Sequence, residues 1–137
     1  MRFTALLAAF FLAAPAFGQQ HQLETVTAAQ AVSSAAAASP KAVRAVVQFK
    51  VESAARSHGG CYLDSEKDFH AATNLGVLIR PSAMPELTKK YGDDLKAALV
   101  GKTVKVIGQV RRRVVAGGRA TATQLEVTHA GQILSVS

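Results

Sequence analysis

Five basic side chains have the type and spacing that phosphate binding requires. They fall within residues 101–119, a segment that holds six basic residues and no acidic one. A guanidinium fork matches the oxygens of a phosphate, and several together give a salt-dependent affinity that is indifferent to sequence. The segment therefore predicts a surface for a polyanion, most simply nucleic acid, although a charged sheet edge that prevents strand addition has the same composition. The side chains are Lys105, Arg111, Arg112, Arg113 and Arg119.

Binding of single-stranded nucleic acid also needs flat apolar surfaces on which bases stack. The chain has no tryptophan, and its aromatic residues make up only 6% of the sequence. Tyr62 is the aromatic side chain that we expect to add apolar contact to the basic segment, with Phe69 a second candidate. A packed tyrosine with an exposed hydroxyl is the alternative for Tyr62.

Three carboxylates two residues apart superficially resemble a calcium-binding loop. They are Asp64, Glu66 and Asp68. An EF-hand needs glycine at its sixth position and glutamate at its twelfth, where this chain has Phe69 and Leu75. We therefore predict a polar loop without a metal or cofactor. Phosphodiester hydrolysis by one of these carboxylates is a less favoured alternative to a protein that is not an enzyme.

Cys61 is the single cysteine, so a disulfide within the chain is impossible. His58 precedes it by three residues, which is a spacing that can bring a thiol and an imidazole together at a turn. No third group to orient such a pair is evident, so we predict no catalytic residues. A buried thiol is the favoured interpretation, and an intermolecular bridge is the alternative.

The first eighteen residues have the pattern of a cleaved secretory signal. Arg2 precedes an apolar run over residues 3–14, and small residues follow at the positions that signal peptidase reads. The run is too short to span a bilayer. We therefore predict a periplasmic or secreted protein that does not span the membrane after cleavage. Residues 19–40, rich in Ala, Ser and Gln, predict a flexible leader or a short surface helix.

The rest of the chain alternates apolar and polar residues with the period of two that is typical of half-buried strands. Met84, Leu87, Tyr91, Leu95 and Leu99 instead recur at helical spacing, with Gly92 as a break and Asp93 as a cap for a second helix. Strands are predicted over residues 43–51, 61–63, 75–79, 102–115, 119–128 and, to extend the sheet, 133–136.

This order predicts an all-β fold with one helical insert over residues 41–137. It is a five-stranded Greek-key barrel with the helix between strands three and four. Residues 49–51, 61–69, 74–79, 101–108 and 125–127 resemble small secreted bacterial OB-fold domains. The resemblance implies a ligand on strands two and three, between loops at residues 53–60 and 113–119. The expected function is secreted, non-enzymatic binding of nucleic acid or another polyanion, with an envelope protein- or glycan-interaction module as the alternative.

Overall fold

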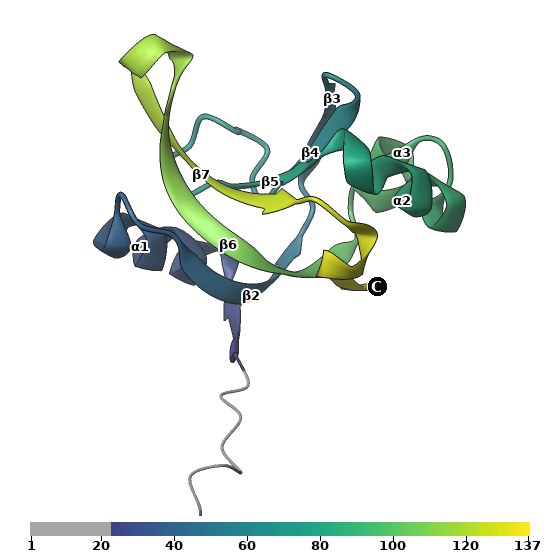
Figure 1. Cartoon of the computed structure of the whole chain (residues 1–137), viewed down its shortest axis with the longest axis horizontal. Coiled ribbons are helices and arrows are strands. Elements are labelled where there is room, and N and C mark those ends of the chain that lie inside the picture. Colours follow the sequence, from purple (N-terminus) through teal and green to yellow (C-terminus); the bar gives the residue numbers. More distant parts are fainter. Residues whose placement is uncertain (1–22) are drawn as a thin grey trace, which may run out of the picture.

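The computed structural model describes residues 23–137. The predicted signal peptide, residues 1–18, and the first four residues of the expected leader lie outside this range. Within it the chain forms eight strands and three α-helices around one strongly curved sheet (Figure 1).

The strands run in the order β1-β2-β6-β7-β5-β4-β3. β8 lies outside this order and pairs with β6. β1 pairs in parallel with β2, and β5 pairs in parallel with β7, while the other neighbours are antiparallel. The strands are β1 (Thr25–Thr27), β2 (Val43–Lys50), β3 (Ser53–Ser57), β4 (Gly60–Asp64), β5 (Leu75–Ile79), β6 (Thr103–Val115), β7 (Ala120–Val127) and β8 (Ile133–Val136).

The prediction of an all-β, closed five-stranded barrel is wrong. The described chain is a mixed α/β structure whose eight-stranded sheet stays open, with β1 and β3 at the ends of the strand order. The chain changes neighbour at Val51 and Glu52, between β2, which pairs with β6, and β3, which pairs with β4. The Val51 N–H donates to the Lys102 carbonyl on the β6 side, and the Glu52 N–H donates to the Asp64 carbonyl at the end of β4. The first predicted strand ends there, and β3 is a separate element.

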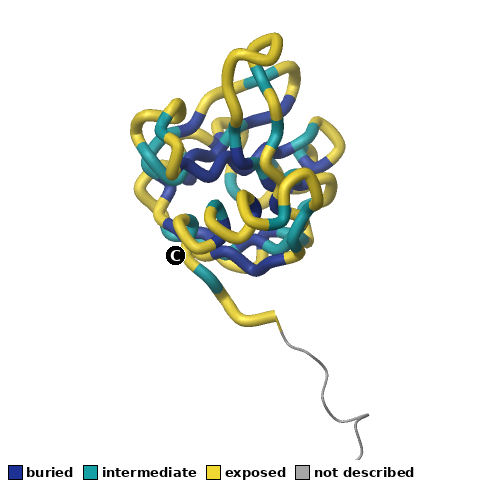
Figure 2. The backbone as a smooth tube through the Cα atoms, turned by 90° about the vertical axis from the view of Figure 1, so that its left-hand side faces the viewer, coloured by how far each residue is buried: buried dark blue, intermediate teal, exposed yellow. Residues whose placement is uncertain are grey.

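Alternation of side chains gives the sheet one buried face. In β7, Leu125 and Val127 are fully buried. Glu126, which lies between them, and Gln124, which precedes Leu125, are half-buried. The same period in β6 buries Val104, Val106 and Val110. Figure 2 shows the buried stretches in the middle of the molecule and an exposed β6–β7 hairpin extending beyond them. The unburied face of the sheet is called the outer face below.

Two short helices follow β5, as the helical spacing predicts. α2 (Met84–Tyr91) ends at Gly92, whose φ of 107° favours glycine, and α3 (Leu95–Leu99) follows. The predicted cap of the second helix is one residue off. The Asp94 side chain, not that of Asp93, accepts the hydrogen bond from the Ala97 N–H at 3.1 Å.

The segment for which we expect a leader or surface helix contains β1 and α1 (Ala28–Ala38). Thr27 and Gln30 cap the helix reciprocally, because each side chain accepts a hydrogen bond from the backbone of the other. Ala31 and Ala35 are buried against the core. Methyl side chains one turn apart let the helix backbone lie close to the sheet.

No helix within residues 23–137 combines the length and apolar character needed to cross a membrane.

Candidate functional site

The β6–β7 hairpin carries most of the predicted binding residues. Its strands extend past the buried core and are joined by residues 116–118, where Gly117 and Gly118 have positive φ values of 64° and 91° (Figure 1). Glycine adopts this backbone without the steric penalty of a Cβ atom. The two glycines therefore close a tight reversal at the tip, and Arg119 follows it as an exposed residue.

The three consecutive arginines divide between the two faces of the hairpin. Arg111 and Arg113 lie on the outer face, because they alternate with Val110 and Arg112 along β6 and Val110 is buried. Arg112 lies on the opposite face, where its Nη2 donates a hydrogen bond to Thr121 Oγ1 at 3.3 Å. Two of the three guanidinium groups can therefore contact one ligand on the outer face.

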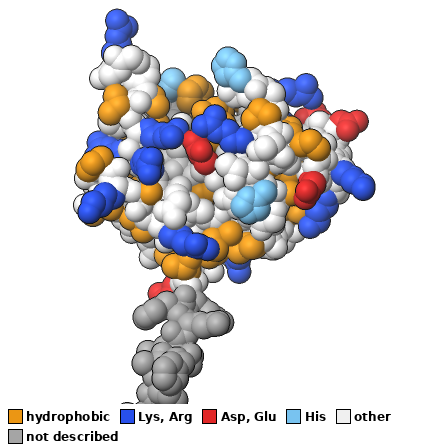
Figure 3. All heavy atoms as spheres, in the orientation of Figure 1, with side chains coloured by type: hydrophobic (Ala, Val, Ile, Leu, Met, Phe, Trp, Pro, Cys, Tyr) orange, Lys and Arg blue, Asp and Glu red, His pale blue; other side chains and the backbone are white. Residues whose placement is uncertain are grey.

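A carboxylate that the sequence analysis did not single out organises these arginines. Glu126 Oε1 lies 3.0 Å from Arg113 Nη1 and 2.6 Å from Arg80 Nη2. The hydrogen bond from Arg80 holds the pKa of Glu126 below its usual range, and the charges of Arg80, Arg113 and Arg111 add to this. Figure 3 shows basic side chains on both sides of one acidic side chain on this face. The cluster of three arginines and Glu126 carries a net charge of +2.

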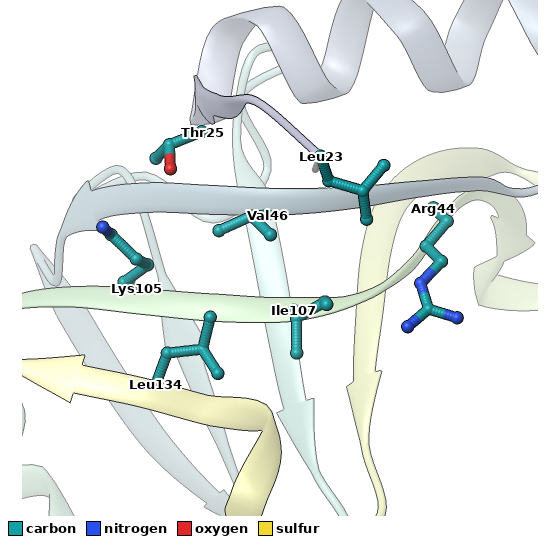
Figure 4. A pocket seen from close by; sticks show the side chains of 7 residues that line it. All are labelled: Leu23, Thr25, Arg44, Val46, Lys105, Ile107 and Leu134. Carbon is teal, nitrogen blue, oxygen red and sulfur yellow. The ribbon is translucent and has the colours of Figure 1, made fainter. Parts of the chain in front are cut away.

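Lys105 does not join this cluster. It is six residues from Arg111 along β6, which places it about 20 Å away at about 3.3 Å per residue. There it borders a shallow groove with Leu23, Ile107 and Leu134, while Arg44 lies at the other end of that groove (Figure 4). The structure therefore does not bring Lys105 together with the arginines, whereas Arg119 lies at the tip of the hairpin itself.

Tyr62 lies in a cleft of about 430 Å³ beside the same hairpin. One wall is the hairpin, through Val115, Ala122 and Gln124, and another is the loop of residues 65–74. Phe69 in that loop is 62% exposed, and its ring meets the ring of His70 edge-on with the centroids 4.0 Å apart. The cleft, as this hollow is called below, thus combines the half-buried ring of Tyr62 and the exposed ring of Phe69 with a largely apolar lining.

Strand register connects the cleft to the arginines. Asp64 in β4 is paired with Gly76 in β5, Gly76 with Gln124 in β7, and Gln124 with Arg111 in β6. These four residues form one row across the outer face, called the cross-strand row below. Neighbouring strands lie about 4.8 Å apart, so the row spans about 14 Å between Asp64 and Arg111. Sequence reasoning missed the row because pairing between distant strands is not visible in a single sequence.

The three closely spaced carboxylates are held apart by separate partners. Asp64 is buried and accepts a hydrogen bond from Asn74 Nδ2 at 3.0 Å. Glu66 Oε2 accepts from the Thr73 hydroxyl, and Asp68 Oδ1 accepts from the His70 N–H at 2.9 Å. Burial raises the pKa of the Asp64 carboxyl, while the hydrogen bond from Asn74 opposes that change. Asp64 lines the cleft, and the sequence signal for its outward direction is its alternation with buried Leu63.

Cys61 and His58 do not form a reactive pair in the described structure. Cys61 is buried and its Sγ contacts the Tyr62 carbonyl, whereas His58 is exposed on the β3–β4 turn. Burial raises the pKa of the Cys61 thiol, with a further contribution from the Asp64 charge. A thiol in this environment stays protonated and is a poor nucleophile.

Across residues 23–137 no three His, Cys, Asp or Glu side chains are grouped closely enough to hold a metal ion. No protein-family model matches the chain, and no curated protein matches it either. The resemblance to OB-fold domains therefore stays a prediction.

Proposed function

We propose that the protein is a non-enzymatic, extracytoplasmic binding protein for single-stranded nucleic acid. The arginines of the hairpin hold phosphates, and the rings of Tyr62 and Phe69 stack on bases in the cleft. The observation that carries the proposal is that the hairpin bearing Arg111 and Arg113 is also a wall of the aromatic cleft. Nucleic acid presents anionic groups and flat rings at a regular short spacing, and both features are needed to occupy this surface.

The net charge of the chain supports the same ligand class. Sixteen Lys and Arg residues against nine Asp and Glu residues give a formal net charge of +7. A positive field of this kind attracts polyanions and speeds their encounter with the protein. The exposed arginines of the hairpin then supply the local contacts, because guanidinium groups pair with phosphate oxygens in a bidentate geometry.

The direct test is a fluorescence-anisotropy titration of a labelled mixed-sequence oligonucleotide of about 12 nucleotides, a length within the range that small single-strand binders cover. We expect tight binding at about 50 mM salt and much weaker binding at about 200 mM. The double variant Arg111→Gln/Arg113→Gln should lower the affinity. Absence of binding at low salt, or binding that is indifferent to salt, would remove the proposal.

A matched control separates local contacts from net charge. Lys89 and Lys90 are exposed on α2, at the opposite side of the molecule from the hairpin in Figure 1. The double variant Lys89→Gln/Lys90→Gln removes the same charge as the arginine variant. It should bind more tightly than the arginine variant, and equal losses would show that the hairpin has no special role.

The alternative function, an envelope module that binds a protein or a glycan, has a distinct signature in the same experiments. The aromatic lining of the cleft also suits a sugar ring or an apolar side chain. In that case, a ligand captured through the cleft would be lost with Tyr62→Ala and retained with Arg111→Gln/Arg113→Gln. Its binding would also depend little on salt.

A further inference from the structure

The floor of the cleft holds a buried carboxylate with one free acceptor. Asp64 is 7% exposed, and its Oδ1 accepts a hydrogen bond from Asn74 Nδ2 at 3.0 Å. Its second oxygen makes no hydrogen bond with a described side chain or backbone group. No fully enclosed side-chain oxygen or nitrogen in residues 23–137 lacks a partner, so this second oxygen keeps contact with the cleft. This oxygen is therefore able to accept a hydrogen bond from a ligand or from water in the cleft.

Asn74 fixes the direction of that acceptor. The Asn74 Oδ1 accepts hydrogen bonds from the Glu66 N–H at 3.1 Å and from the Ser65 hydroxyl at 3.4 Å. These bonds orient the amide so that its Nδ2 points to Asp64 and to the Phe69 carbonyl. Because its donors are already engaged, Asn74 leaves the second oxygen of Asp64 to another donor.

Gly76 lines the cleft and has no side chain to fill the space beside the carboxylate. A Cβ atom at this position would lie 3.4 Å from Asp64 Oδ1 and 3.9 Å from Tyr62 Cδ1. Glycine therefore leaves the space between the carboxylate and the tyrosine ring open. A flat ligand that contacts Tyr62 can reach Asp64 with its edge.

On the basis of the proposed function, we propose that Asp64 makes the cleft selective for bases with an exocyclic amino group, and for cytosine over uracil in particular. The N4 amino group of cytosine donates a hydrogen bond to a carboxylate. Uracil has a carbonyl oxygen at the same ring position, and that oxygen faces the carboxylate as a second acceptor. Burial raises the pKa of the Asp64 carboxyl, because the protein stabilises its negative charge only in part. A hydrogen bond donated by the ligand stabilises that charge further.

The test compares oligo-deoxycytidine with oligo-deoxyuridine of equal length at neutral pH and fixed salt. The two strands have the same backbone and lack the thymine methyl group, so they differ only on the edge that Asp64 reads. We expect the unsubstituted protein to bind the cytidine strand about tenfold more tightly, the size of one hydrogen bond to a charged group.

The variant Asp64→Asn reverses the chemistry at the same atom. Its amide oxygen can accept from Asn74, which leaves an NH₂ donor in the cleft where the carboxylate offered an acceptor. We expect the preference for cytidine to disappear or to turn toward uridine. A thermal melt of the variant checks that it folds. The comparison of the two strands on the unsubstituted protein tests the proposal without any variant.

Equal affinities of the unsubstituted protein for the two strands would overturn the selectivity, and so would an unchanged preference in Asp64→Asn. If binding is equal but depends on salt, the proposed function stands and only the role of Asp64 is refuted. If neither strand binds, the proposed function fails, and the selectivity fails with it.

Discussion

Replacing Glu126 by glutamine removes a carboxylate that competes with a ligand for the arginines of the outer face. Glu126 Oε1 holds Arg113 at 3.0 Å and Arg80 at 2.6 Å, so a phosphate competes with this carboxylate for Arg113. In the variant Glu126→Gln the side chain keeps its shape and loses its charge. Arg113 is then free to pair with a phosphate, and the affinity for single-stranded oligonucleotides should rise.

The size of the effect follows from the number of arginines available. Each phosphate contact contributes about −0.7 to the slope of log affinity against log salt for a single strand. Three arginines of the hairpin can contact a ligand on the outer face: Arg111, Arg113 and Arg119. With Arg113 held by Glu126, two contacts give a slope of about −1.4, and the variant with three gives about −2.1. Between about 50 mM and about 200 mM salt, these slopes correspond to losses of about 7-fold and about 20-fold.

Anisotropy titrations at four or more salt concentrations measure both slopes. The control is Glu86→Gln, which removes the same charge from α2, away from the hairpin. The control should change the affinity slightly, through net charge, and leave the slope as it is. A slope for Glu126→Gln that is equal to or shallower than that of the unsubstituted protein would refute the competition between Glu126 and phosphate.

Three further predictions concern the cleft and the core beneath it. Gly76→Ala places a methyl group 3.4 Å from Asp64 Oδ1 without backbone strain, so it should weaken oligonucleotide binding in calorimetry and leave the melting temperature nearly unchanged. Because burial raises the pKa of Asp64, its charged form costs stability above that pKa, and the cost disappears as the pH falls. Asp64→Asn should therefore raise the free energy of unfolding at neutral pH by more than at acidic pH in urea titrations; an equal gain at both would contradict the buried charge. Leu125→Ala, at a fully buried position of β7, should lower the free energy of unfolding by about 2–5 kcal/mol in the same assay.

Local pattern was sufficient to predict most elements of the fold. Alternation of apolar and polar residues predicted β2 and β4 to β8 at nearly their observed bounds, and helical spacing predicted α2 and α3. The closed barrel was wrong because it depends on where a strand changes neighbour. Val51 and Glu52 carry no turn residue that marks this change, and only their hydrogen bonds to Lys102 and Asp64 reveal it.

The candidate site was predictable in part for the same reason. Alternation along β6 is sufficient to place Arg111 and Arg113 on one face of the strand. It said nothing of Glu126 in β7, because which residue faces an arginine depends on the pairing of the two strands. Lys105 was grouped with the arginines on charge, although the length of β6 separates it from them. Tyr62 was singled out as an aromatic residue, while Asp64 and Gly76 beside it became meaningful only through the cross-strand row.

The two charged ends of the cross-strand row act over different distances. Arg111 is exposed, so its charge and those of its neighbours act on an approaching polyanion through solvent. Asp64 lies about 14 Å away along the row, beyond the Debye length of about 8 Å at physiological salt. Its negative charge therefore does little to repel a phosphate bound at Arg111. A ligand that enters the cleft meets Asp64 only through direct contact, so capture by charge and selection by hydrogen bonding are separate steps on one surface.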